Sequence, residues 1–135
     1  MIVFHGTDQN SANAILTTGI DVTLGGGELG QGFYVGENVA LVAARAKGKT
    51  PNNFAVIEFD VNNSDFITLN MKIIRRQDFL VKQWASLIRR NLTHTRTYGY
   101  DVICAPYATF EFSNQYKFET QAGENVINNA NKKTL

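Results

Sequence analysis

The sequence predicts an α+β fold in a single domain that covers residues 1–135. Two observations predict this class. Hydrophobic residues make up 44% of the chain, which is enough to bury a core and too many for a disordered composition. Helical patterns gather early in the chain and strand patterns late, which favours segregated helices and strands over a regular βαβ array.

The first segments predict a strand followed by a short helix. Residues 2–4 (Ile-Val-Phe) form an apolar run that is typical of a strand, and it ends in the polar segment 5–7 (His-Gly-Thr). We expect Asn10 or Ser11 to cap a helix with one apolar face. Gly19 is expected to end that helix, as glycine does just beyond a helix C-terminus.

A glycine-rich loop, a strand and a second helix are expected next. Residues 25–32 contain five glycines, a density that excludes a regular helix or a central strand and predicts a loop. Residues 33–35 form the next predicted strand. Residues 38–47 carry a helical pattern that Gly48 is expected to end.

The rest of the chain predicts further strands around one long helix. Later strands are expected over residues 54–61 with a continuation through 66–69, over 101–107 and over 115–120. The spacing of apolar residues predicts the longest helix over residues 71–92. The tail from Asn125, which is rich in Asn and Lys, is expected to fray.

Charge, cysteine content and hydropathy narrow the function classes. The formal net charge is +1 and no basic run exceeds a pair, which argues against a polyanion-binding surface. The single cysteine, Cys104, lies in an apolar run and is expected to be buried and inert, so folding needs no oxidising compartment. No apolar run is long enough to span a bilayer, and no signal-peptide pattern is present. We expect no membrane partner and a cytoplasmic site of action, with delivery or secretion as part of a larger protein left open.

Three segments carry residues suited to chemistry, in a fixed order along the chain. They are Phe4 to Thr7 at the end of the first strand, Gly30 to Gly36 around the second, and Ser113 to Phe118 on the last. Together they resemble the diphtheria-toxin-like (His-Tyr-Glu) side of the ADP-ribosyltransferase superfamily, which includes the poly(ADP-ribose) polymerases. The resemblance spans roughly residues 2–120 and is greatest to a bacterial branch with glutamine in the third position. It implies a split β-sheet core with flanking helices and NAD+ as co-substrate.

The resemblance also implies site residues. In the family the histidine bonds the adenosine ribose, the tyrosine stacks on nicotinamide, and the third residue grips the ribose 2′-hydroxyl. The implied catalytic residues are His5, Tyr34 and Gln115. The residues implied for NAD+ binding are His5, Gly6, Thr7, Gly30, Gly32, Phe33, Tyr34 and Arg45, and no metal site is expected. Taken singly, His5 and Tyr34 would each be interpreted as structural residues, so the ordered set carries the prediction.

Physical chemistry also predicts how these residues would contact a ligand. A glycine at position 6 lets a ligand approach the backbone closely, which suits a flat carboxamide held by one N–H and one C=O. An aromatic ring such as that of Tyr34 gains from face-to-face contact with another ring. Backbone N–H groups of the loop 25–32 are expected to lie against the diphosphate.

The chain departs from the family pattern at the third position. Gln115 replaces the glutamate whose charge stabilises the oxocarbenium-like transition state, and an amide carries no charge. Glu28 or Glu111 is the alternative source of a carboxylate. Glu119 lies roughly 13 Å further along the strand and cannot take the same place.

A second departure lies after the tyrosine. The polymerases carry another aromatic residue about a dozen positions on, where this chain has residues 43–45 (Ala-Ala-Arg). Either Phe33 or Tyr107 is expected to cover the other face of the nicotinamide ring, or Arg45 approaches the phosphates.

The function expected from the resemblance is mono-ADP-ribosyl transfer from NAD+ to a protein or nucleic acid, by a bacterial toxin or effector domain. A neutralising antitoxin or immunity protein is then an expected partner. The sequence does not identify the acceptor, which the loops 93–100 and 108–114 are expected to select. The alternatives are an inactive module that binds NAD+ or ADP-ribose, and an NAD+ glycohydrolase. RNA 2′-phosphotransferase chemistry ranks below them because the basic residues it needs cannot be placed.

Overall fold

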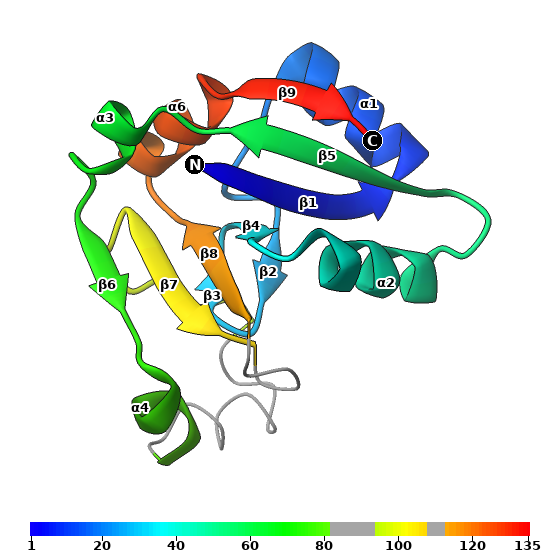
Figure 1. Cartoon of the computed structure of the whole chain (residues 1–135). Coiled ribbons are helices and arrows are strands. Elements are labelled where there is room, and N and C mark those ends of the chain that lie inside the picture. Colours follow the sequence, from blue (N-terminus) through cyan, green and yellow to red (C-terminus); the bar gives the residue numbers. More distant parts are fainter. Residues whose placement is uncertain (82–93, 108–112) are drawn as a thin grey trace.

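The computed structural model describes residues 1–81, 94–107 and 113–135. Over these residues the protein is a mixed α+β fold with a seven-stranded mixed sheet and five helices, so the predicted class is confirmed (Figure 1). The strands of this sheet are β1 (Ile2–Asp8), β4 (Phe33–Gly36), β5 (Phe54–Asp60), β6 (Met71–Ile73), β7 (Val102–Pro106), β8 (Asn114–Phe118) and β9 (Asn131–Thr134). The helices are α1 (Gln9–Thr18), α2 (Val39–Lys49), α3 (Asn63–Phe66), α4 (Arg76–Val81) and α6 (Gln121–Asn128). No helix within the described ranges has the length and apolar character needed to cross a bilayer.

The sheet divides into two blocks that meet at a single residue pair. Its strand order is β6-β7-β8-β4-β1-β5-β9, and only β6 and β7 are parallel. Strand β1 is paired with β5 along its whole length, whereas β1 and β4 share only the register pair of Phe4 with Gly36. Beyond that pair the two strands diverge, and the blocks β1-β5-β9 and β4-β8-β7 run in different directions (Figure 1).

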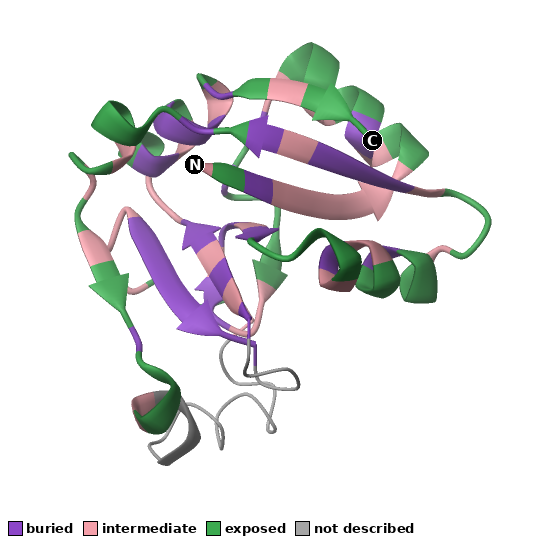
Figure 2. Cartoon of the chain, in the orientation of Figure 1, coloured by how far each residue is buried: buried purple, intermediate pink, exposed green. Residues whose placement is uncertain are grey.

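The main core lies on one face of this sheet. Its fully buried members include Val3, Ile57 and Phe118 from three different strands, and α1 and α6 add Ala12 and Ile127. Figure 2 shows this burial concentrated along the central strands, while the outer faces of the helices are exposed. Since a buried aliphatic or aromatic side chain contributes about 1.5–3 kcal/mol, this face holds the two sheet blocks together.

The first strand and helix are present, with a different cap. Strand β1 extends to Asp8, whose carboxylate accepts hydrogen bonds from the N–H and hydroxyl of Ser11, both at 2.8 Å. The predicted cap at Asn10 or Ser11 is therefore wrong, because Asp8 is the last extended residue and its side chain reaches the first turn. Gly19 ends α1 as predicted, with φ at +98°.

The second helix is also present and is longer than predicted. Asn38 caps it by accepting from the N–H of Leu41 at 3.0 Å. Gly48 does not end the helix, which continues to Lys49, because the N–H of Thr50 still bonds to the carbonyl of Ala46. The predicted strands at 33–35, 54–61, 101–107 and 115–120 are confirmed as β4, β5, β7 and β8.

Two predictions between β5 and β7 are wrong. Strand β5 does not continue through 66–69, because the Asn62 side chain accepts from the N–H of Asp65 and starts α3 instead. The predicted helix over 71–92 begins too early, since β6 pairs Met71 with Val102 in parallel register. Here the sheet edge overrides a helical pattern. The helix α4 falls inside the predicted span, and the rest of that span lies outside the described residues.

The tail from Asn125 is ordered, which corrects the prediction that it frays. Thr120 caps α6 by accepting from the N–H of Gly123, and that helix buries Val126 and Ile127. Strand β9 then pairs with β5, with Thr134 opposite Ile57. A polar tail is held in place because the edge of β5 offers backbone partners to any sequence.

Candidate functional site

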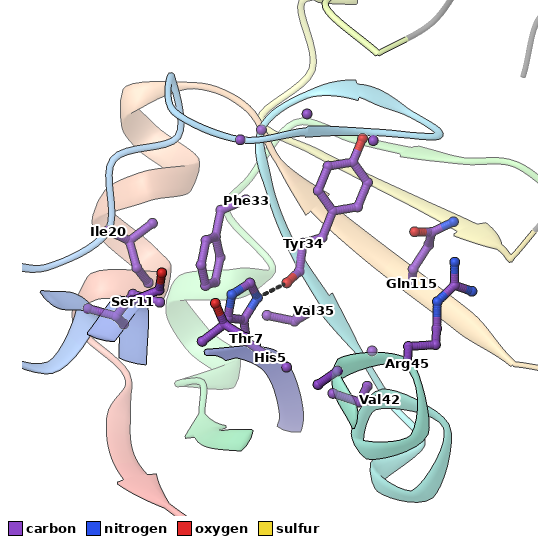
Figure 3. A pocket seen from close by; sticks show the side chains of 18 of the residues that line it. His5, Thr7, Ser11, Ile20, Phe33, Tyr34, Val35, Val42, Arg45 and Gln115 are labelled. Atoms are coloured by element: carbon purple, nitrogen blue, oxygen red, sulfur yellow. Dashed lines mark hydrogen bonds between the residues drawn. The ribbon is translucent and has the colours of Figure 1, made fainter. Parts of the chain in front are cut away.

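A pocket of about 870 Å³ opens where β1 and β4 diverge. Small-molecule pockets usually have volumes of about 300–1,000 Å³, so this pocket has the size of a ligand-binding site. The predicted site residues that line it are His5, Gly6, Thr7, Gly32, Phe33, Tyr34, Arg45 and Gln115. Figure 3 shows Ser11 and Ile20 at one end of the pocket and Arg45 and Gln115 at the other, with His5, Phe33 and Tyr34 between them. Three strands and helix α2 thus bring the predicted residues together.

His5 is a half-buried, neutral hydrogen-bonding group. Its Nδ1 lies 2.7 Å from the backbone carbonyl of Tyr34, which can only accept, so Nδ1 carries the proton. Burial lowers the pKa of His5, the charge of Lys49 lowers it further, and the bond to Tyr34 opposes both. In the neutral ring the remaining nitrogen, Nε2, is an acceptor. His5 therefore offers an acceptor to a hydroxyl donor in the pocket.

Phe33 supports His5 from the core side. The two rings stack with their centroids 4.3 Å apart, and Phe33 meets Phe59 edge-on at 5.8 Å. Consecutive residues of a strand point to opposite faces, so Phe33 and Tyr34 do not face the same side of β4. The interpretation of Phe33 as a second cover for a ring stacked on Tyr34 is therefore wrong.

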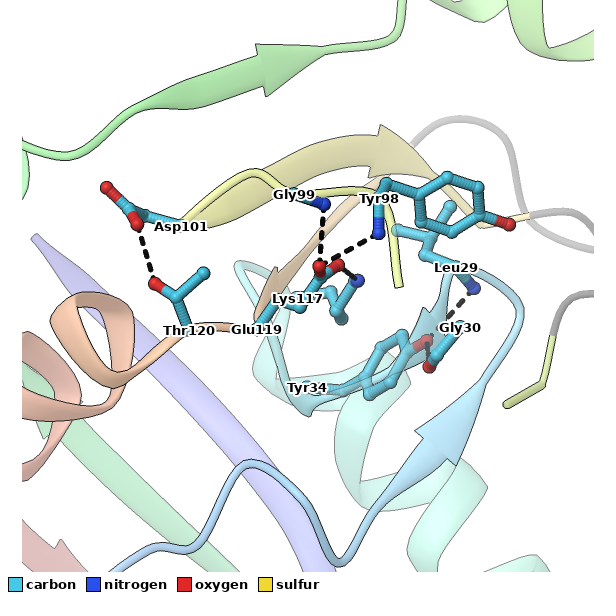
Figure 4. Close-up of polar contacts among 9 residues, drawn as sticks. All are labelled: Leu29, Gly30, Tyr34, Tyr98, Gly99, Asp101, Lys117, Glu119 and Thr120. Carbon is cyan, nitrogen blue, oxygen red and sulfur yellow. Dashed lines mark hydrogen bonds and ion pairs between the residues drawn. The ribbon is translucent and has the colours of Figure 1, made fainter. Parts of the chain in front are cut away.

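Tyr34 holds the glycine-rich segment. Its hydroxyl donates to the carbonyl of Gly30 at 2.5 Å and accepts from the N–H of Leu29 at 2.9 Å (Figure 4). A Cβ on Gly27 would lie 2.9 Å from the ring atom Cζ, so the segment rests directly on this ring. Burial raises the pKa of Tyr34, with the charge of Glu28 adding to the rise, and the hydroxyl stays protonated.

The glycine-rich segment is a small hairpin. Strands β2 (Gly26–Gly27) and β3 (Gly30–Gln31) pair apart from the main sheet, with Gly27 opposite Gly30. Gly30 has φ at +91°, and a Cβ there would lie 2.1 Å from the carbonyl oxygen of Arg96. Gly30 lies outside the pocket lining, which corrects its prediction as a ligand contact, and its backbone shapes the turn instead.

Gly6 permits close packing of helix and strand. A Cβ on Gly6 would lie 2.8 Å from both the carbonyl oxygen of Val42 and the Cβ of Ala46. The requirement for glycine thus comes from α2, whereas the sequence suggested ligand approach alone. This contact sets α2 against β1 and places Arg45 and Lys49 at the pocket.

A carboxylate enters the pocket from the tip of the hairpin. Gln115 is 3% exposed, and its Nε2 donates to Glu28 Oε2 at 2.9 Å and faces the carbonyl of Pro106 at 3.4 Å. Arg45 Nη2 lies 3.7 Å from Glu28 Oε1, and its guanidinium lies 4.7 Å from the centre of the Tyr107 ring. Of the two alternative carboxylates, Glu28 is thus beside Gln115, and Glu111 lies outside the described residues.

Behind the pocket, a buried ion pair anchors a neighbouring turn. Lys117 is fully buried and pairs with Glu119, which also accepts from the N–H groups of Tyr98 and Gly99 at 2.8 Å each (Figure 4). Burial lowers the pKa of Lys117, and Glu119 opposes that shift. Glu119 is absent from the pocket lining, in agreement with the prediction that it cannot replace the family's glutamate. No pattern in the sequence marks Lys117 as buried.

The sequence interpretation missed part of the lining. The additional polar or charged side chains are Ser11, Asp21, Lys49 and His94. Lys49 follows Arg45 by four residues, so helical spacing could have placed both on the same face of α2. Ser11 and Ile15 belong to α1, whose apolar face was interpreted only as core.

The arrangement combines complementary chemical groups. His5 offers an acceptor, Arg45 and Lys49 offer positive charge, and Glu28 offers negative charge next to a buried amide. It suits a ligand with hydroxyl groups, an anionic group and a centre that becomes positive. Among the residues that the structure covers, no cluster of His, Cys, Asp and Glu could hold a metal ion. Comparison of the sequence with the models of known protein families and with curated proteins finds no match.

Proposed function

We propose that this chain is an NAD+-dependent mono-ADP-ribosyltransferase with the split-sheet fold of that superfamily. One observation carries the proposal. His5, Tyr34 and Gln115 come from β1, β4 and β8, and all three line one pocket at the point where the sheet divides. Residues chosen from the sequence for one reaction thus converge on one cavity of suitable volume.

The pocket supplies a group for each part of NAD+. His5 Nε2 accepts from a ribose hydroxyl, and Arg45 with Lys49 attracts the diphosphate. Of the described strands, none pairs with the β4-facing edge of β1 beyond Phe4. Backbone groups of that edge are therefore available to a carboxamide, as the sequence suggested for Gly6.

The proposed reaction breaks the bond between ribose C1′ and the nicotinamide nitrogen. The bonding electrons leave with nicotinamide, which departs as a neutral molecule, and positive charge builds on the ribose. A nucleophile of the acceptor then forms the new bond to C1′ and releases a proton to the solvent. The pocket contributes by holding NAD+ in one conformation and by excluding water from the reacting bond.

The test uses NAD+ labelled either in the adenylate phosphate or in the nicotinamide ring. With purified protein and cell lysate, the account predicts that the ring label is released and the adenylate label becomes attached to a macromolecule. Digestion with protease or nuclease then identifies the acceptor class. A Lys133→Gln variant, on the exposed face of β9, serves as a control that keeps the activity.

The other outcomes separate the alternatives. Release of the ring label without attachment of the adenylate label identifies an NAD+ glycohydrolase. Binding of NAD+ without release of either label identifies a binding module. Either result contradicts the proposed transfer.

A further inference from the structure

The hairpin β2–β3 presents Glu28 and Leu29 as its two-residue tip. Gly27 and Gly30 are paired on either side of this tip. The Leu29 side chain is fully buried in a small cluster with Ile103 and Ala105, so it anchors the tip from behind. The residue before it, Glu28, lines the pocket and has a side chain that is only 16% exposed. The tip therefore directs one apolar residue into the core and one carboxylate into the pocket.

Two of the predicted triad residues hold this tip. The Tyr34 hydroxyl bonds to Leu29 and Gly30, and its ring supports Gly27, so Tyr34 contacts the residues on both sides of Glu28. Gln115 bonds to the carboxylate itself at 2.9 Å. The position of the Glu28 carboxylate is thus determined at its backbone and at its oxygen atoms.

The surroundings of Gln115 explain why an amide stands at this position. Its Nε2 lies between the Glu28 carboxylate and the Pro106 carbonyl, two groups that only accept hydrogen bonds. A carboxylate at position 115 would face both of them, and two carboxylates in contact cannot both stay ionised. The amide at position 115 and the carboxylate at position 28 are therefore complementary.

We propose that Glu28 is the catalytic carboxylate of this site and that Gln115 is the residue that positions it. The proposal rests on the proposed function. In the reaction, the C1′–nitrogen bond breaks with its electrons leaving on nicotinamide, and the Glu28 carboxylate stabilises the positive charge that develops on the ribose. No atom of Glu28 is consumed, and the charge disappears when the acceptor bonds to C1′. The charge that Gln115 lacks is thus supplied from a different part of the chain.

Arg45 is the resting counter-ion of this carboxylate. Its side chain is 39% exposed and reaches Glu28 at 3.7 Å while lying over the Tyr107 ring. An ion pair of this length, with a guanidinium that solvent reaches, is weak and easily exchanged. The diphosphate of NAD+ competes for the same guanidinium, which leaves the charge of Glu28 to the ribose.

The test is a Glu28→Gln variant assayed for nicotinamide release. Glutamine has the same size, and its oxygen still accepts from Gln115, so the substitution removes the charge and little else. Because removing one electrostatic contact at a reacting centre typically costs about 10²–10³-fold in rate, kcat is expected to fall by about a hundredfold or more. The dissociation constant for NAD+, measured by calorimetry, is expected to change by less than about threefold. The matched control is Glu37→Gln, because Glu37 is exposed, accepts from the N–H of Asn114 at 3.1 Å and is outside the lining.

A second variant separates a catalytic role from a structural one. In Glu28→Ala, added formate is expected to restore part of the release rate, because a small carboxylate enters the space that the side chain leaves. Lack of restoration in a folded Glu28→Ala protein contradicts the proposal, as does a wild-type kcat in Glu28→Gln. Both results leave the proposed function intact when the wild-type protein is active. Absence of release from the wild-type protein overturns the proposed function and this inference together.

Discussion

Replacing Tyr34 by phenylalanine tests how the hairpin is held. The variant keeps the aromatic ring under Gly27 and removes only the hydroxyl that bonds to Leu29 and Gly30. Two hydrogen bonds of about 1 kcal/mol each are lost. The residue Leu29 is fully buried, so its N–H is left without a partner at a further cost of about 1–3 kcal/mol.

The expected loss of stability from Tyr34→Phe is therefore about 3–5 kcal/mol, spread between the whole fold and the hairpin. Urea denaturation measures the global part. Amide hydrogen exchange at Leu29 measures the local part, and its protection is expected to fall while protection along β5 stays nearer to that of the wild type. Because Glu28 sits at the hairpin tip, nicotinamide release is expected to fall as well.

The reasoning fails if Tyr34→Phe has the wild-type urea midpoint and unchanged protection at Leu29. Such a result would mean that the hairpin is held by the Leu29 side chain alone. A loss of stability with unchanged protection at Leu29 would instead place the effect elsewhere in the core.

Three further predictions concern other residues of the site. Gly6→Ala is expected to lose about 1–3 kcal/mol of unfolding free energy, because its Cβ would meet the Val42 carbonyl oxygen at 2.8 Å; an unchanged urea midpoint would contradict this. Since the fold lowers the pKa of His5 and keeps its ring neutral, the unfolded chain binds the extra proton, so wild-type stability falls relative to His5→Asn as pH drops below about 6.5 and levels off below the lowered pKa of the folded state. A constant difference between the urea midpoints of the two proteins from pH 7.5 to pH 5 would refute that linkage. Arg45→Met is expected to raise KM for NAD+ about tenfold with a smaller effect on kcat, and steady-state kinetics in which kcat alone changes would contradict a role at the diphosphate.

Local pattern was enough to predict the strands that carry the site. The segments that form β1, β4 and β7 are apolar, and β8 carries the aromatic residues Tyr116 and Phe118. These residue types favour strands, so each segment predicts its own conformation. Strands β6 and β9 were missed for the opposite reason. Each is short, and each is determined by a distant partner: Met71 by Val102, and Thr134 by Ile57. A polar sequence such as that of β9 does not predict a strand, because its conformation depends on pairing with the edge of β5.

The candidate site also has a part that the sequence predicts and a part that it does not. The types and order of His5, Tyr34 and Gln115 predicted a common pocket, and the structure places all three in its lining. What each side chain contacts there could not be predicted, because the contacts depend on how the sheet blocks meet. The bond between Gln115 and Glu28 joins residues far apart in the chain.

Nicotinamide released from NAD+ by the purified protein, with and without cell lysate, is the most direct test of the central claim. Chromatography of the wild-type protein beside His5→Asn is sufficient. Asparagine keeps a donor for the Tyr34 carbonyl and removes the acceptor at Nε2. The account predicts release by the wild-type protein that lysate stimulates, and a strong loss in the variant. No release by the folded wild-type protein under either condition would contradict the account.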